Sequence, residues 1–356
     1  MNKEIIISGI QQLGVGTTNV YESWRWYAKY FGMDTRVFEE RAKAMFMLPY
    51  TGNQPQERHA ALAVNLQGGG GFEIWQYTER TPQKVGFELQ LGDLGIFAGK
   101  IKCPNVEKVW QWYKEEGIEI SEISTNPLGE KVFFFNDPFG NCFEMVESTE
   151  WFSKPTKLTG GPVGAVIGST NIDKALVVYQ QILGFDTIVS DTTDTYKDFA
   201  WLKGGEGRFR RVILRQSKQP IGYFSRMFGK AEIELVQALD RTPKKIYEGR
   251  FWGDPGFIQL CFDIQGMDAM REKCASLNCP FTVDSSKSVD IFDMGEASGN
   301  FVYIEDPDGT LIEMVETYRI PIIKKLGWYI DLTKRDPKKP LPDWLLKAMK
   351  FNKFKG

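Results

Sequence analysis

One stretch of sequence decides the fold: Phe72-Glu73-Ile74-Trp75-Gln76, which is followed by Arg80-Thr81-Pro82. It returns in the second half of the chain as Ile233-Glu234-Leu235-Val236-Gln237, followed by Arg241-Thr242-Pro243. A second stretch, Asp137-Pro138-Phe139-Gly140 leading to Glu144, returns as Asp306-Pro307-Asp308-Gly309 leading to Glu313. Repetition of this kind indicates duplicated structural units. Because a glutamate inside an apolar strand is costly unless its charge is satisfied, the repeat also marks candidate sites.

Length and composition are those of a globular protein. The 356 residues, 42% hydrophobic and 25% charged, suit two domains of about 150 residues and a tail. No apolar run approaches the roughly 20 residues of a membrane helix, and the start does not resemble a signal peptide, so we expect a cytoplasmic protein with no membrane partner. The five cysteines form no CxxC pair, which favours reduced thiols.

Each half of the chain divides into two copies of one unit, a strand, a helix and three further strands. Asn19 and Asn171 are predicted helix caps, because each precedes a helical pattern that ends at a glycine, and a further helix is expected from Asn105 to about Glu116. We therefore expect an α+β fold in which four βαβββ units pair into two cup-shaped mixed sheets. The predicted domains are residues 6–153 and 161–319, followed by a basic C-terminal tail, 320–356, with a short helix.

The tail differs from the body in charge. Residues 320–356 hold ten Lys or Arg and three Asp, a net charge of +7, which leaves −9 for residues 1–319. A nucleic-acid-binding arm would fit this asymmetry, but the tail has no long basic run. We expect it to pack on the acidic body, with Trp344 and Leu345 docked from a helix over about 343–351, or to serve self-association in a homodimer. No nucleic-acid partner is expected.

Four such units resemble the vicinal oxygen chelate superfamily, which includes glyoxalase I, methylmalonyl-CoA epimerase, the extradiol dioxygenases and 4-hydroxyphenylpyruvate dioxygenase. The resemblance covers about residues 6–319. In that superfamily metal ligands project from the first and last strands of the units. Transferred to this sequence, the ligand places are Gln12 and Glu73, Ala98 and Glu144, Gly164 and Glu234, and Gln259 and Glu313.

The closest local match is to the extradiol dioxygenases. Their signature ends in a tyrosine, an Asp-Pro-x-Gly turn and the ligand glutamate, as from Tyr303 to Glu313 here. The histidine that should precede the tyrosine is replaced around Met294-Gly295-Glu296, and the family's two histidine ligands fall at Gly164 and Gln259. The single histidine, His59, is interpreted as an ordinary surface or loop residue. One histidine excludes an intrachain 2-His-1-carboxylate iron site and a histidine-based triad.

The remaining candidate ligands are carboxylates and amides. We expect one set in each domain: Gln12, Glu73 and Glu144 in the first, and Glu234, Gln259 and Glu313 in the second. Oxygen-only ligands favour Mg, Mn or Ca over Fe or Zn. The alternative is that these groups are hydrogen-bonded structural residues.

The second domain carries the candidate catalytic groups. Glu296 and Tyr303 are candidates for proton transfer, the alternatives being an exposed loop acid and a packed strand tyrosine. Arg211 and Arg215 are candidates for binding a substrate carboxylate, although a solvated strand face would show the same pattern. We therefore favour the second domain as the active half.

Three functions remain open. The first is a glyoxalase- or dioxygenase-like enzyme (isomerase, lyase or dioxygenase type) that uses a divalent metal on a small oxygenated metabolite. The second is a metal-free protein that sequesters a small molecule, as resistance-type members of the superfamily do. The third is a scaffold with a degenerate site.

Overall fold

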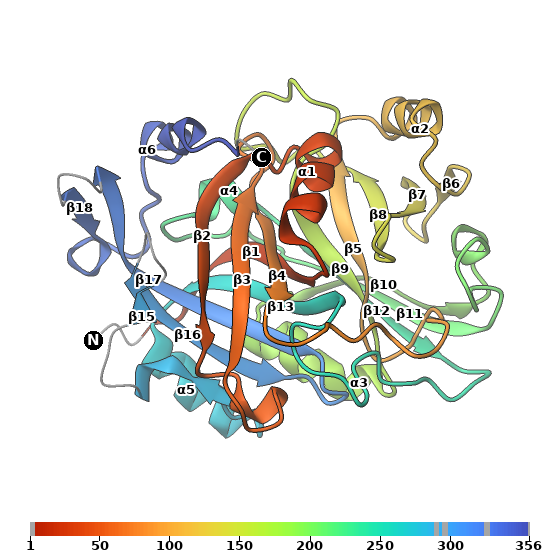
Figure 1. Cartoon of the computed structure of the whole chain (residues 1–356). Helices are drawn as coiled ribbons and strands as arrows, with labels where there is room; N and C mark the ends of the chain where they lie inside the picture. The colour runs from red at the N-terminus through yellow and green to blue at the C-terminus, as the bar shows by residue number, and fades with distance from the viewer. Residues whose placement is uncertain (1–3, 288–291, 294–297, 324–327, 355–356) are drawn as a thin grey trace.

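Two curled sheets carry the strands of the chain (Figure 1). The structure is a computed structural model that describes residues 4–287, 292–293, 298–323 and 328–354. Sheet A contains β1 (Ile6–Gly16), β2 (Thr35–Ala44), β3 (Gln56–Val64), β4 (Gly71–Tyr77), β13 (Gly256–Gln265), β14 (Val283–Asp284), β15 (Phe292–Asp293), β16 (Ser298–Glu305), β17 (Leu311–Ile323) and β18 (Trp328–Asp331). Sheet B contains β5 (Gly95–Cys103), β6 (Ser124–Thr125), β7 (Lys131–Asn136), β8 (Cys142–Glu147), β9 (Pro162–Gly168), β10 (Thr187–Asp194), β11 (Phe209–Arg215) and β12 (Glu232–Ala238). We call their concave faces cup A and cup B.

The predicted α+β fold class with repeated strand-helix-strand units is confirmed. The helices are α1 (Val20–Phe31), α2 (Val106–Glu115), α3 (Ile172–Leu176) with a π-helical turn (Val177–Ile182), α4 (Ser225–Phe228), α5 (Met267–Ser276) and α6 (Asp343–Lys347). The side chains of Asn19 and Asn171 each accept a hydrogen bond from the backbone N–H three residues ahead, as predicted, and Asn105 caps α2 in the same way. Gly32 ends α1 in the left-handed conformation, with φ 62°, which a glycine adopts without strain.

The units pair differently from the expected domains. β1 of the first unit lies antiparallel to β13 of the fourth, and β5 of the second lies antiparallel to β9 of the third. The strand order is β14-β16-β17-β13-β1-β4-β3-β2 in sheet A and β10-β11-β12-β9-β5-β8-β7-β6 in sheet B. The prediction that residues 6–153 and 161–319 each form one cup is therefore wrong. Every unit offers the same free edge on its first strand, so the repeat does not reveal which two units join.

A second set of contacts ties neighbouring units together on the faces opposite the cups. The Tyr27 hydroxyl of α1 donates to Asp137 Oδ2 at 2.7 Å, and the Tyr179 hydroxyl donates to Asp306 Oδ2 at 2.9 Å. Both aspartates begin the duplicated Asp-Pro-x-Gly turns. One hydrophobic cluster, to which all four units contribute, fills the space between the sheets, and the cups carry separate clusters.

The tail packs across cup A. Leu345 and Leu346 of α6 are buried, whereas Trp344 is 67% exposed, so the predicted docking is confirmed for Leu345 and wrong for Trp344. The far end is held by the Phe354 ring, which stacks on Trp24 with ring centroids 4.1 Å apart. β17 runs to Ile323, beyond the expected domain end at residue 319. None of the helices in the described ranges is long and apolar enough to cross a membrane.

The pairing can be tested by cutting the chain. Residues 1–153 alone would leave β1 and β5 without β13 and β9, and exposed strand edges associate or unfold. We expect this fragment to give no folded monomer by circular dichroism and size-exclusion chromatography with light scattering. Adding residues 154–356 should restore a folded 1:1 complex. A cooperatively folded, monomeric 1–153 fragment would contradict the pairing.

Candidate functional site

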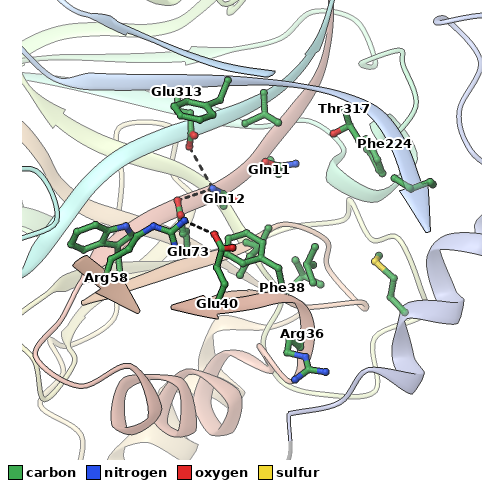
Figure 2. A pocket seen from close by; sticks show the side chains of 18 of the residues that line it. Gln11, Gln12, Arg36, Phe38, Glu40, Arg58, Glu73, Phe224, Glu313 and Thr317 are labelled. Carbon is green, nitrogen blue, oxygen red and sulfur yellow. Dashed lines mark hydrogen bonds and ion pairs between the residues drawn. The ribbon is translucent and has the colours of Figure 1, made fainter. Parts of the chain in front are cut away.

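Four polar side chains from four strands meet at the base of cup A. They are Gln12 on β1, Glu73 on β4, Gln259 on β13 and Glu313 on β17; Figure 2 labels three of them. Gln12 Nε2 lies 3.1 Å from Glu73 Oε2 and 3.5 Å from Glu313 Oε2. Gln259 Nε2 lies 2.9 Å from Glu73 Oε2 and 3.4 Å from Glu313 Oε2. Both amides thus donate to the same two carboxylate oxygens, and we call this group the QEQE centre.

Strand register places the four residues. In the parallel pair β1–β4, Glu73 stands opposite Gly14, two residues after Gln12; in β13–β17, Glu313 stands opposite Cys261, two residues after Gln259. A register shift between Ile10 and Gln12 marks a β-bulge at Gln11. Because of this bulge, the neighbouring residues Gln11 and Gln12 both line the cavity of cup A. The superfamily's ligand places are therefore brought together, but from the first and fourth units. The predicted sets Gln12, Glu73, Glu144 and Glu234, Gln259, Glu313 are contradicted.

The QEQE centre places two carboxyl groups close together and away from solvent, which raises the pKa of both. Burial and the neighbouring Glu73 raise the pKa of Glu313 to about 8, and burial also raises the pKa of Glu73, an effect that the Arg58 guanidinium opposes. Near neutral pH the pair therefore keeps a proton on Glu313. Tyr303, a predicted catalytic residue, is buried and hydrogen-bonded to Glu313. Burial holds the pKa of the Tyr303 hydroxyl well above its usual value, so this group is a hydrogen-bond donor.

The two glutamines are not equivalent. Trp252 Nε1 donates to Gln259 Oε1 at 3.0 Å, so the Gln259 amide is held with its nitrogen toward the carboxylates. Trp252 is itself fixed, because its ring packs edge-to-face on Trp75 with centroids 4.7 Å apart and its carbonyl accepts from Tyr77. Gln12 Oε1, in contrast, is buried without a hydrogen-bond partner. Turning the Gln12 amide would break no hydrogen bond to its oxygen, whereas turning the Gln259 amide would also break the bond from Trp252.

Arg58 is a polar residue of the site that the sequence analysis missed. Its Nη2 donates to Glu40, and its buried Nη1 has no hydrogen-bond partner (Figure 2). It lies on β3 two residues before Ala60 and four before Leu62, so alternation along the strand would have placed it on the concave face. Arg58 Nη1 is thus a donor available to a bound molecule beside Glu73.

The centre opens into a cavity of about 360 Å³. Its polar end holds Gln12, Glu73 and Glu313 of the QEQE centre, together with Arg58 and Tyr303, and Gln259 lies buried behind them. Its other walls are mostly apolar and come from β2 and β3, from the segment around α4, and from the tail, including Phe38, Leu62, Met227, Phe228, Leu346 and Met349. A largely apolar cavity with a few convergent polar groups is the usual form of a small-molecule site.

Cup B carries an ion cluster at its base. Glu144 and Glu234 surround the ammonium group of Lys100, whose Nζ lies 3.0 Å from Glu144 Oε2, 2.5 Å from Glu234 Oε2 and 2.5 Å from Glu232 Oε1. The ligand places before these glutamates hold Ala98 and Gly164, which have no donor side chain. The lysine therefore supplies the positive charge that a metal would bring. Cup B does not fit a divalent cation.

The predicted substrate arginines have partners within the protein. Arg211 is fully buried and pairs with Glu234 and Asp198, both at 2.7 Å. Arg215 pairs with Glu232 and Glu130, both at 2.6 Å. Both arginines therefore belong to the ion cluster of cup B. They do not lie beside Glu313, so they do not form the predicted binding site for a substrate carboxylate. The second domain is therefore not a separate active half.

Two other predictions need comment. Glu296 lies outside the described residues. His59, expected at the surface or in a loop, is buried in β3, where its Nε2 lies 3.1 Å from Glu39 Oε1, so that expectation is wrong. Across the described ranges, no three His, Cys, Asp or Glu side chains form a group that could hold a metal; the QEQE centre has two carboxylates and relies on an amide for a third oxygen.

Comparisons with known proteins agree with this architecture. Residues 9–145 match the model of the Glyoxalase/Bleomycin resistance protein/Dioxygenase superfamily, which confirms the resemblance found in the sequence. A mutant of glyoxalase I from Zea mays superposes with a TM-score of 0.54 at 12% identity, covering 86% of this chain and 92% of that one. A putative dioxygenase from Bacillus subtilis gives 0.53 at 14% identity, covering 87% and 86%. At these identities the likeness shows a shared fold. No curated protein matches the sequence.

The role of Lys100 can be tested by stability. Lys100→Met would leave three buried carboxylates without their common cation, and we expect a loss of about 3–5 kcal/mol in the free energy of unfolding. Lys102→Met, on the same strand, is the matched control, because the buried Lys102 ammonium donates only to the Glu150 carbonyl and its pKa is lowered to about 8. Urea unfolding should show a much smaller loss for this control. Equal losses would argue against the ion cluster.

Proposed function

We propose that this chain, whose residues 9–145 match the model of the Glyoxalase/Bleomycin resistance protein/Dioxygenase superfamily, is a divalent-metal-dependent enzyme that acts on a small molecule with adjacent oxygen atoms. The observation that carries this proposal is the convergence of Gln12, Glu73, Gln259 and Glu313 at the end of a mostly apolar cavity. All four residues stand at places where the superfamily carries metal ligands. Two buried carboxylates that share neighbours are costly without a cation between them.

The donor set fits a hard divalent ion. Glu73 and Glu313 supply two carboxylates, whose charge equals that of one such ion. Gln12 supplies a third oxygen once its amide turns, since its Oε1 has no other partner. Gln259 does not fit as a ligand, because Trp252 holds its oxygen away from the centre. Three oxygen donors with water in the remaining positions suit Mg, Mn or Ca.

The remaining groups can handle a substrate oxygen and a proton. When bound, the ion would act as a Lewis acid toward adjacent oxygens of the substrate. The Tyr303 hydroxyl, the Gln259 amide and Arg58 Nη1 are hydrogen-bond donors around the same space and would stabilise negative charge that develops on those oxygens. With Glu73 and Glu313 taken up as ligands, a carboxylate outside the ion's ligand set would move the proton, and Glu40 of the cavity wall is such a group.

This arrangement favours an isomerase or lyase over a dioxygenase. The 2-His-1-carboxylate site of iron oxygenases needs two imidazoles, and the single histidine of this chain, His59 on β3, is bound to Glu39 of β2. Proton transfer beside an activated carbonyl needs only oxygen ligands and an acid–base group.

A metal-free binding protein is the second candidate. The hydrogen bonds from Gln12 and Gln259 already satisfy part of the need of the two carboxylates, and Trp252 keeps Gln259 in that donating orientation. In such a protein the centre would bind the polar end of a ligand through hydrogen bonds alone.

Metal content separates the two candidates. Purified protein dialysed against Mn²⁺ should retain about one ion per chain by elemental analysis, because one of the two cups fits a cation. Glu313→Ala should lose it, since a charge-bearing ligand is removed. Glu144→Gln is the control in cup B, where the amide has the shape of the carboxyl that it replaces and the Lys100 ammonium already occupies the centre, so the ion should be retained. An unmodified protein that retains no ion would favour the binding protein.

A second substitution tests the place of Gln259. Gln259→His should tighten binding of Zn²⁺ or Co²⁺ by at least about tenfold in calorimetric titration, because an imidazole nitrogen replaces an amide that Trp252 holds in a non-ligating orientation. Gln259→Leu, which removes the same amide without adding a ligand, is the control and should give no such gain. No gain from the histidine would mean that position 259 does not face the ion.

A further inference from the structure

The end of the cavity opposite the QEQE centre is built by the C-terminal tail. Leu345, Leu346, Met349 and Asn352 line it, together with Phe224 and Met227 from the α4 region. In Figure 2 Phe224 lies on the side of the cavity away from Glu73. The tail follows the last strand of the fourth unit, so its side chains are additions to the repeated fold.

The tail is fixed at both ends of its path across the cup. The Leu341 amide donates to the Tyr223 carbonyl at 2.8 Å, and Arg226 pairs with Asp343 at 3.0 Å. Further on, the Arg36 amide donates to the Asn352 carbonyl at 2.8 Å, and Lys353 pairs with Asp34 at 2.9 Å. A segment held at both ends presents its apolar side chains to the cavity in a defined position.

The cavity offers no uncompensated positive charge. Its cationic lining residues are Arg36, Lys43 and Arg58. Arg36 lies 3.7 Å from Glu39, Lys43 lies 3.8 Å from Glu57, and Arg58 pairs with Glu40. A divalent ion at the QEQE centre would be neutralised by Glu73 and Glu313. A phosphate, sulfonate or carboxylate on the ligand would therefore compete with Glu40 and Glu73 for Arg58 and would add net negative charge beside them, which is strongly unfavourable.

We propose that residues 341–354 form the substrate-selecting wall of cup A, in which Leu345, Leu346 and Met349 hold the hydrocarbon body of a small molecule that carries no anionic group. Its oxygen-bearing end would reach the QEQE centre, and in this respect the inference rests on the proposed function. The cavity volume of about 360 Å³ is near the lower end of the usual range of about 300–1,000 Å³, which fits a compact ligand such as one with a single aromatic or branched aliphatic group.

A matched pair of dyes tests whether the cavity binds an apolar molecule and whether it excludes an anionic one. N-phenyl-1-naphthylamine is uncharged, and 8-anilinonaphthalene-1-sulfonate has the same rings with one sulfonate. Titrated into the metal-free full-length protein, the uncharged dye should bind saturably and at least about tenfold more tightly than the sulfonate, because the sulfonate finds no free cation. Equal affinity, or tighter binding of the sulfonate, would overturn the charge argument.

Substitutions in the tail locate the binding. Leu346→Trp and Met349→Trp should each weaken binding of the uncharged dye at least about tenfold, because the indole fills the space that the rings need. Trp344→Ala, on the exposed side of the same helix, should leave the affinity unchanged. Two filling positions are used because either change could disturb α6, and the affinity is read from the variant that keeps a cooperative thermal transition. An unchanged affinity in that variant, or an equal loss in Trp344→Ala, would overturn the proposal.

The dye experiment is independent of the metal. If no ion is retained but the dye still depends on Leu346 and Met349, the proposed function fails and the wall stands. If Glu313-dependent metal binding is found but the dye affinity is unchanged by the substitutions in the tail, the proposal of a substrate-selecting wall is wrong and the proposed function stands.

Discussion

The burial of like charges at the base of each cup is the constraint on which the rest of the structure depends. The first and last strands of every unit run side by side, so a glutamate on the last strand points into the cup wherever two units join. Each cup therefore buries two such carboxylates, and each must supply a compensating group. In cup A the amides of Gln12 and Gln259 donate hydrogen bonds to the carboxylates, and in cup B the ammonium group of Lys100 forms ion pairs with them.

The amides of cup A and the lysine of cup B have opposite effects on whether the cup can bind a further cation. A lysine satisfies its neighbours permanently, and Arg211 adds a second buried cation against Glu234, so the centre of cup B is closed to another positive ion. Amides are neutral, so the carboxylates of cup A still lack a cation. The pKa of Glu313 is raised because burial and the nearby Glu73 are not offset by a positive charge. The duplicated fold thus keeps one cup for structure and leaves the other with an unmet charge, which is the condition for binding chemistry.

The sequence predicts each unit well because the relevant signals are local. Asn19 and Asn171 cap their helices as expected, and the glutamates of the repeat lie on inward-facing strand positions. The pairing of units was missed, because four similar first strands offer equivalent edges and the choice is made by packing across the whole chain. The role of Lys100 was missed for a related reason: a lysine in a strand acquires three carboxylate partners only after β8 and β12 are brought beside β5.

The same reasoning explains why the character of cup A is set by residues outside the repeat. Trp252 precedes β13 in a connecting segment, yet its indole N–H decides that Gln259 donates rather than ligates. The tail follows the fourth unit, yet Leu346 and Met349 give the cavity its apolar end. In cup B the corresponding space is filled by core side chains such as Phe134 and Phe199. Duplication supplied two similar frames, and connecting segments that were free to differ determined which frame could hold a ligand.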